Sequence, residues 1–488
     1  MINIMDSVTF QKASFDEKDP LSIYDFSGLL IGHSLHSLLG NDVINHSRKG
    51  KGGLGQMVEE LFFRYKINSN READFSDARV ELKCTPLLKN KSDNSFRIKE
   101  RLVCTMIDYF ELVNTRFEDS HLLAKCKLML LLFYLHVSGT PIYDYEFLFR
   151  ILWQIPEKDL LLIKKDYETI ATKVRNGEAH LLSEGDTIYL GACRKGQTGD
   201  TPQSQPFSSI KANRRAFSLK PAYMRYILKH AVDSGNNHFS NYRANDTANY
   251  ELVSAEELKK ASFEKIIINR FSQFYGLNYL EICDKLGITP YQAKSKYADI
   301  AGLIASSSRS KRISDAEEFV KSGIMMKTIR LRANGMPKEA MSFKNIDYQE
   351  VYDNDNWFQS EAYEIFTNRF LFVVFKPEHG ETIVIHNNKT NKDVVEQSYV
   401  LDRVFFWTMS QKDLDSARKY WEHIRTNILA NKINLNYFWN ISDKKGFHVR
   451  PKATKKIQLT PNPHGGETEK YCYWLNADFV KKIIDENS

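Results

Sequence analysis

Apolar and polar positions follow two different periods along this chain, and each period predicts a different kind of element. In residues 55–65 the apolar side chains recur every three or four positions, which predicts a helix with one buried face. Residues 79–84 alternate between apolar and polar, as a half-buried strand does. Residues 127–135 are nearly all apolar and predict a strand at the centre of a sheet. The first half of the chain is therefore predicted to be a mixed α/β domain.

The same patterns divide the rest of the chain into elements and domains. Residues 233–247 are rich in Asn, Ser and Gly and poor in apolar residues, which is typical of a linker. We therefore expect a first, catalytic domain at 1–235, a linker at 236–250 and a second mixed domain at 251–488. Further strands are predicted at 101–107, 187–192 and 216–219, and further helices at 160–174 and 221–230.

One short segment combines residue types that suit the hydrolysis of a phosphodiester. Asp74 lies in a polar turn, and Glu81 and Lys83 follow on the predicted strand, where alternate side chains point to the same face. If the turn folds back, the Asp74 carboxylate comes beside Glu81, and two carboxylates with a backbone carbonyl make an oxygen site suited to Mg²⁺. A lysine beside that ion can lower the pKa of the attacking water or stabilise charge at the phosphorus. Local pattern alone slightly favours a different interpretation, a solvent-exposed edge strand with an ion pair.

Two further residues lie close to this segment in the predicted fold. Glu59 lies on the helix that precedes it, and Lys125 precedes the predicted central strand. Each also has a structural interpretation, Glu59 as an ordinary exposed glutamate and Lys125 as a lysine that covers the start of a strand.

A basic group lies downstream, on turns next to predicted strands. Basic side chains on such turns can neutralise phosphates, and Arg and Lys can read guanine edges in the major groove of DNA. The structural alternative is a solvated basic face. The residues of this group are Arg194, Lys195, Lys211, Arg214, Arg215 and Lys220.

Composition narrows the class of protein without choosing one. With 488 residues, 42% of them hydrophobic, the chain has enough apolar residues for about two to four domains and is not wholly disordered. No apolar run approaches about 18 residues, so we expect no membrane span, and the polar N-terminus does not resemble a signal peptide. The 6 cysteines include no Cys-x-x-Cys pair, which excludes a zinc ribbon and a disulfide scaffold and fits a reducing cytosol. The net charge of +7 permits a nucleic-acid partner but does not by itself argue for one.

Taken in order, these residues resemble a known family. They are similar to the mismatch-repair nicking endonuclease MutH and its relatives, the GATC-specific type II restriction endonucleases. The first match covers residues 40–230, and the whole length resembles the larger restriction-enzyme branch of the family. Several motifs that occur in the same order as in the family are far more specific than a single Glu-x-Lys. They reverse the earlier preference for an exposed edge strand with an ion pair and favour an active site. The motifs lie at 55–59, 74–83, 121–125, 189–195 and 215–220.

The resemblance implies a site and a reaction. The reaction is Mg²⁺-dependent cleavage of DNA at GATC, 5′ of the G, which leaves 5′ overhangs and 5′ phosphates. Asp74 and Glu81 are implied to be metal ligands and Lys83 the third member of the core. The resemblance further implies that Glu59 is an auxiliary carboxylate that reaches a metal ion, and that Lys125 is another active-site cation.

One position departs from the family pattern. The nicking relatives carry a Tyr where this chain has Ser218, which we count among the DNA-binding residues. A small side chain leaves room for an N6-methyl group in the major groove, so we expect that adenine methylation does not block cutting.

The second half weakly repeats the first. Glu264 resembles Glu59, and residues 318–327 resemble 74–83, with Met325 where Glu81 stands. Methionine is no ligand for Mg²⁺, so we expect a degenerate copy that does not cut but still binds DNA as an effector domain. The alternative is a purely structural domain. The residues expected to bind effector DNA are Arg450, Lys452, Lys455 and Trp474.

We therefore predict an α/β fold of two restriction-endonuclease-like, MutH-type domains. The predicted function is that of a cytoplasmic type II restriction endonuclease that cuts both strands and is stimulated by a second DNA site. Its expected partners are duplex DNA containing GATC and the DNA methyltransferase of the same restriction-modification system, with a monomer in the free state and a dimer on DNA. Two alternatives remain, a repair-type nickase of the same fold and a DNA-binding protein without catalysis. The intact set of Asp74, Glu81 and Lys83 argues against the second.

Overall fold

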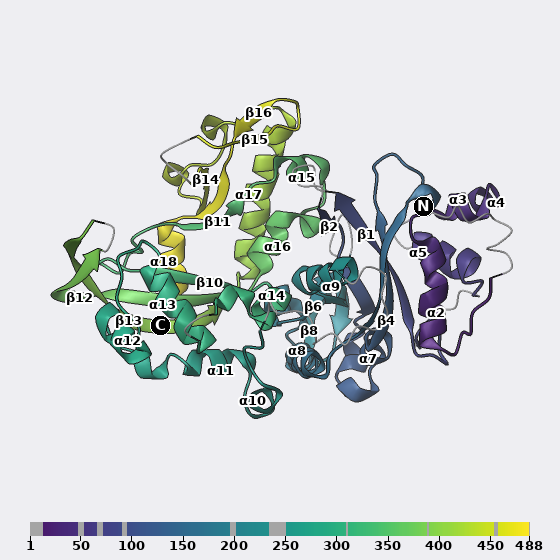
Figure 1. Ribbon diagram of the computed structural model, residues 1–488, viewed down its shortest axis with the longest axis horizontal. Coiled ribbons are helices and arrows are strands. Elements are labelled where there is room, and N and C mark those ends of the chain that lie inside the picture. Colours follow the sequence, from purple (N-terminus) through teal and green to yellow (C-terminus); the bar gives the residue numbers. More distant parts are fainter. Residues whose placement is uncertain are drawn as a thin grey trace. The chain divides into compact units, whose positions relative to one another are not determined.

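The protein is described by a computed structural model (Figure 1). The chain forms two compact units, each of which makes its contacts mainly within itself. The first comprises Met1–Leu182 with Thr187–Thr247, and the second comprises Ser183–Asp186 with Ala248–Ser488. All but the last residue of the predicted linker at 236–250, and also Lys455, lie outside the described residues. The structure describes residues 13–46, 53–65, 72–89, 95–195, 202–233, 250–308, 311–387, 390–452 and 457–487.

A four-stranded sheet forms the centre of the first unit, in the order β2-β1-β4-β5. Strands β1 (Glu81–Lys89) and β4 (Leu128–Leu135) run parallel, while β2 (Phe96–Ile98) and β5 (Phe147–Gln154) pair antiparallel on either side. The sequence prediction of a central strand after residue 127 is confirmed, because β4 is paired on both edges and its middle residues are fully buried. The parallel pairing places the first residue of β1 beside the first residues of β4.

A second, smaller sheet of the first unit has the order β3-β9-β6. Its strands are β3 (Leu102–Met106), β9 (Arg215–Leu219) and β6 (Leu190–Arg194). The strand predicted from residue 187 begins only at Leu190. The reason is that the Asp166 carboxylate accepts the backbone N–H groups of residues 188–190, at 2.7, 2.7 and 2.9 Å, and so holds the chain in a turn.

Helices cover both sheets of the first unit. The helix predicted at 55–65 begins and ends earlier than expected: α5 (Gly53–Met57) passes into a π-helical segment, η2 (Val58–Phe62), which carries Glu59. Between β6 and β9 of the small sheet, the chain forms a hairpin of β7 (Pro202–Gln205) and β8 (Ser208–Asn213). The helices are α2 (Pro20–Ser27), α3 (Leu35–Leu39), α4 (Asp42–Asn45), α5 (Gly53–Met57), α6 (Tyr109–Leu112), α7 (His121–Cys126), α8 (Glu157–Arg175) and α9 (Pro221–Asp233).

The second unit has the same strand order in its two main sheets. One sheet has the order β10-β12-β13, with a parallel pair followed by an antiparallel pair, as in β1-β4-β5. The other has the order β11-β17-β14, as in β3-β9-β6. The register agrees as well, since Leu475 pairs with Met341 and Phe447 where Leu219 pairs with Leu102 and Leu190. The strands are β10 (Met325–Arg330), β11 (Met341–Asn345), β12 (Phe370–Asn387), β13 (Lys392–Trp407), β14 (Phe447–Arg450), β15 (Leu459–Pro461), β16 (Glu467–Glu469) and β17 (Cys472–Leu475).

The helices of the second unit follow a comparable order. In both units a helix of 19 residues follows the main hairpin, α8 in the first and α17 in the second. The main difference is the β12–β13 hairpin, which continues far beyond its pairing with β10 (Figure 1). The helices are α10 (Ala255–Lys260), α11 (Phe263–Asn269), α12 (Tyr279–Leu286), α13 (Lys296–Ser306), α14 (Glu317–Ser322), α15 (Tyr348–Asp353), α16 (Glu361–Thr367), α17 (Gln411–Leu429) and α18 (Ala477–Glu486).

Two expectations from composition can be compared with this fold. None of the described helices has the length and apolar character that crossing a membrane requires. Every one of the cysteines is described, and each is free, so the expected absence of a disulfide scaffold agrees with the structure.

Candidate active site

A tight turn brings Asp74 back onto β1. Phe75 and Val80 pair across the turn through N–H···O bonds of 3.0 and 3.2 Å, and Arg79 completes it with a φ of 56°. The strand predicted to begin at residue 79 therefore begins at Glu81. The Asp74 carboxylate accepts a hydrogen bond from the backbone N–H of Leu82 at 2.9 Å. Because Leu82 directly follows Glu81, this bond holds the Asp74 carboxylate at the start of the strand.

Glu81 lies at the centre of the site with only 1% of its surface exposed. Its carboxylate accepts hydrogen bonds from two ammonium groups. Lys83, from the same face of β1, donates to Oε1, and Lys125 donates to both oxygens at 3.2 and 3.1 Å. A buried carboxylate is costly unless it is paired, and the two lysines supply that pairing.

Burial and neighbouring carboxylates raise the pKa of both remaining carboxylates of the site, Glu59 and Asp74. Burial and then the neighbouring Asp74 raise the pKa of Glu59 to about 7, with a smaller contribution from Glu81. Burial and then Glu81 raise the pKa of Asp74. Burial is the largest influence on Lys83 and works to lower its pKa, but the charge and the hydrogen bond of Glu81, together with the Asp74 charge, hold that pKa above its ordinary value. The site therefore gathers three carboxylates, Glu59, Asp74 and Glu81, and two lysines, Lys83 and Lys125.

The donor set fits a hard divalent cation. Asp74 and Glu81 offer carboxylate oxygens at the start of one strand, and Glu59 adds a third carboxylate. The pKa of Glu59 is raised first by burial and then by the Asp74 charge, and a cation would relieve the repulsion between the two carboxylates. Within the described ranges, no three His, Cys, Asp or Glu side chains are close enough together to form a ready metal cluster. In this structure the oxygens of Glu81 are occupied by the ammonium groups of Lys83 and Lys125. Metal binding at this site thus requires the Glu81 side chain to exchange a lysine for the ion.

A pocket of about 560 Å³ adjoins the lysine side of the site. Its lining includes Lys125, Arg214 and the hairpin residues Gln203 and Ser204. Sequence reasoning identified the two basic residues but missed Gln203 and Ser204. Their only signal was a polar, proline-containing stretch after a basic turn, which predicts a loop and not a pocket wall.

The residues predicted to bind DNA separate into two groups. Lys211 and Arg214 are exposed, and Arg194 and Lys195 are half-buried at the end of β6. Arg215, Ser218 and Lys220 are buried, with 2%, 0% and 6% of their surfaces exposed.

The buried group corrects the prediction for these three residues. The Arg215 guanidinium donates to the carbonyl oxygens of Ala192 and Leu182, and the Lys220 ammonium donates to the carbonyl of Thr187. These donors are held by main-chain carbonyls inside the unit, so they link the small sheet to its preceding turn and are turned away from solvent. Ser218 is also fully buried, so its small side chain creates no space at the protein surface. The argument that linked Ser218 to tolerance of N6-methyladenine therefore loses its basis.

The same positions in the second unit carry a different set of side chains. Met325 begins β10 and pairs with Phe370, as Glu81 begins β1 and pairs with Met129. Counting back four positions from these partners, Phe366 takes the place of Lys125. Lys327 remains where Lys83 stands.

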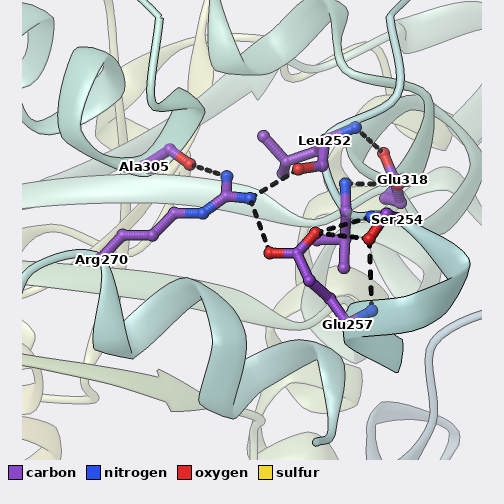
Figure 2. Close-up of polar contacts among 7 residues, drawn as sticks. Leu252, Ser254, Glu257, Arg270, Ala305 and Glu318 are labelled. Atoms are coloured by element: carbon purple, nitrogen blue, oxygen red, sulfur yellow. Dashed lines mark hydrogen bonds and ion pairs between the residues drawn. The ribbon is translucent and has the colours of Figure 1, made fainter. Parts of the chain in front are cut away.

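Glu318 does not take the position of Asp74, which corrects that part of the predicted repeat. It lies on α14, where the first unit has the turn after Asp74, and its carboxylate accepts the N–H groups of Leu252 and Val253 at 3.0 and 3.1 Å. Figure 2 shows this network, in which Arg270 also donates to the carbonyls of Leu252 and Ala305. Glu318 therefore fastens the chain segment that opens the second unit.

The predicted effector residues are only partly available. The Arg450 guanidinium lies 3.8 Å above the Trp474 ring, and the Trp474 indole N–H donates to the Arg450 carbonyl at 3.1 Å. Trp474 is 8% exposed and stacks on His448 on its own sheet, which leaves little of the indole for a base. Arg450 also lines a pocket of about 380 Å³ with Arg332 and Lys338. Lys452 is exposed.

A family model and individual similar proteins both point to the MutH-like endonucleases. The family described as DNA mismatch repair enzyme MutH matches residues 63–166, which include Asp74, Glu81, Lys83 and Lys125. The type II restriction enzyme Sau3AI of Staphylococcus aureus is 29% identical over 93% of this chain and 96% of that enzyme. The DNA mismatch repair proteins MutH of Shewanella amazonensis (strain ATCC BAA-1098 / SB2B) and Shewanella woodyi (strain ATCC 51908 / MS32) are 28% and 25% identical over 42% of this chain, and they are covered to 91% and 88%. Together with the α/β fold of the restriction-endonuclease type, these matches support a MutH-like restriction endonuclease family for this chain, and with it the activity of a site-specific deoxyribonuclease.

Proposed function

We propose that the protein is a type II restriction endonuclease that cuts both strands of DNA at GATC, 5′ of the G, with Mg²⁺ as its cofactor. The observation that carries this proposal is the cluster of Asp74, Glu81, Lys83 and Lys125 at the start of β1. Alignment with Sau3AI over nearly the whole of both chains supports a restriction enzyme over a repair protein. GATC and the 5′ overhang follow from the motif resemblance.

In this proposal, Asp74 and Glu81 hold the ion, and Glu59 supports it from the neighbouring helical segment. A bound Mg²⁺ activates the attacking water and offsets the charge that develops on the phosphate. Lys83 keeps its proton, because Glu81 holds its pKa high, so it acts as a cation beside the phosphate and not as a base. Lys125 faces the pocket that Arg214 also lines, and the two cations orient the DNA backbone there.

The partners follow from the same proposal. Duplex DNA with a GATC site is the substrate, and Lys211, Arg214, Arg194 and Lys195 meet its phosphates or base edges. One active site must serve two strands, so two chains that are monomers in the free state meet on the DNA. The second unit acts as an effector domain, the system includes a paired DNA methyltransferase, and the protein works in the cytoplasm.

A repair-type nickase is the second candidate, favoured by the match of residues 63–166 to the mismatch repair family. Supercoiled plasmid separates the two functions. A restriction enzyme converts it to linear fragments in Mg²⁺, whereas a nickase stops at open circles. Open circles at complete reaction would replace the proposal by the nickase.

A further inference from the structure

In the second unit, Lys327 occupies the position of Lys83, and Lys327 and a second lysine, Lys452, contact the same strand. Lys327 Nζ donates to the carbonyl oxygen of Ser342 at 2.6 Å, and Lys452 Nζ donates to the carbonyl of Phe343 at 3.1 Å. Ser342 and Phe343 are neighbours on β11, so the two ammonium groups approach the same short piece of strand. Lys327 Nζ also lies 4.8 Å from the centre of the Phe343 ring.

The charge balance at this place is the reverse of that in the first unit. In the first unit, Glu81 bonds to both lysines, and Asp74 and Glu59 add two more carboxylates. In the second, Met325 and Phe366 take the positions of Glu81 and Lys125 and bring no charge. Across the part of the chain that the structure describes, no ion pair joins Lys327 or Lys452 to a carboxylate.

The nearest counterpart of an active-site acid is already neutralised. Glu264, which the repeat aligns with Glu59, pairs with Arg369 at 3.2 Å. Burial and then Lys452 lower the pKa of Lys327 to about 8, so two like charges stand together at a cost that an anion between them would relieve. Lys452 is exposed and Lys327 is partly exposed, so an anion can approach from solvent.

We propose that Lys327 and Lys452 form a phosphate site of the second unit, which binds a phosphodiester of duplex DNA without a metal ion. The inference rests on the proposed action on DNA and gives the effector domain a defined contact. Two ammonium groups suit the oxyanion of a backbone phosphate, whereas the carboxylates of the first unit repel DNA until a cation is bound. The second unit is therefore the part of the chain that holds DNA in the absence of Mg²⁺.

The test measures binding of the full-length protein to a fluorescent GATC duplex by anisotropy, in EDTA and in Ca²⁺. The wild-type protein is expected to bind in EDTA. Lys327→Gln with Lys452→Gln should weaken that binding at least about tenfold, as expected for lost charge-assisted contacts, and lower the salt slope by about 1. The additional binding that Ca²⁺ confers, which belongs to the carboxylate site, should survive in this variant.

Matched controls keep the result specific. Lys412→Gln with Lys419→Gln removes the same charge from exposed positions of α17 and should bind like the wild type. Lys327→Arg with Lys452→Arg keeps the charge and should retain binding in EDTA. Comparing thermal unfolding of all variants separates a lost contact from a misfolded unit. If the double Gln variant is misfolded, Lys452→Gln alone, at an exposed position, should still weaken binding in EDTA.

Three outcomes would overturn the inference. They are wild-type binding only when a divalent ion is present, unchanged binding by the double Gln variant, or equal losses in the α17 control. Displacement of DNA by millimolar inorganic phosphate beyond that by chloride at equal ionic strength would support a phosphate site. Failure of the wild-type protein to cut in Mg²⁺ is a separate result, which contradicts the proposed function and not this site.

Discussion

Lys125 Nζ lies 3.1 Å from Glu81 Oε2, although Lys125 belongs to the last turn of α7 and Glu81 opens β1. The contact follows from the parallel pairing of β1 with β4, because α7 leads directly into β4. Lys83 bonds to the same carboxylate from β1. Glu81 is thus held by two cations that a metal ion must partly replace, and the predictions below follow from that arrangement.

Removing either predicted ligand should abolish cleavage and leave DNA binding largely intact. We expect Asp74→Ala or Glu81→Ala to lower the cleavage rate by at least about 10³-fold, or about 4 kcal/mol of activation free energy. Cleavage of plasmid in saturating Mg²⁺ measures this, with binding followed by anisotropy. Lys83→Ala should behave similarly. Lys99→Ala is the control, since Lys99 pairs with Glu100 outside the cluster. Cutting near the wild-type rate by either ligand variant would remove that residue from the site.

The raised pKa of Glu59 predicts that Mg²⁺ and protons compete. Its folded-state pKa of about 7 lies above the ordinary value, so Glu59 is protonated below pH 7 and cannot ligate. The Mg²⁺ concentration for half-maximal cleavage should therefore rise as pH falls from 8 to 6, approaching about tenfold per unit well below the pKa. Glu59→Gln should flatten that dependence. A half-maximal Mg²⁺ concentration that is independent of pH in the wild type would show that Glu59 is not linked to the ion.

Local pattern predicted the near-sequence part of this site, whereas the long-range members Glu59 and Lys125 were predicted by the family resemblance. Period-two alternation placed Glu81 and Lys83 on one face, and the polar turn allowed Asp74 to return, since these relations are set within a few residues. Arg215 and Lys220 were misread because a basic residue beside a strand looks the same in sequence whether it faces solvent or a carbonyl. Their acceptors, the carbonyls of Leu182 and Thr187, come from a distant segment that no local pattern identifies.

Arg215 should therefore matter for stability and not for DNA contact. We expect Arg215→Met to lower the free energy of unfolding by about 3 kcal/mol, because the carbonyls of Ala192 and Leu182 lose their buried donor. Chemical denaturation measures this loss. Arg214→Met, at the neighbouring exposed position, should change stability by less than about 0.5 kcal/mol and weaken DNA binding. The reverse pattern would restore Arg215 as a DNA-binding residue.

An effector role for the second unit predicts a dependence on the number of sites. A plasmid with two GATC sites should be cut faster than one with a single site, because the tethered second site has a high effective concentration. Adding a cleavage-resistant GATC oligonucleotide should stimulate cutting of the one-site plasmid. Arg450→Gln should weaken this stimulation, since Arg450 faces a pocket with Arg332 and Lys338. If the second unit is folded but no oligonucleotide concentration stimulates cutting, the second unit has a structural role and not an effector role.

The most direct test of the central claim is digestion of a mapped supercoiled plasmid, with and without Mg²⁺, followed by sequencing of the ends. The account predicts linear fragments in Mg²⁺ alone, each with a 5′-phosphorylated GATC overhang, and no product from Glu81→Ala under the same conditions. Cutting in EDTA, ends at other sequences, or full activity of the Glu81 variant would contradict it.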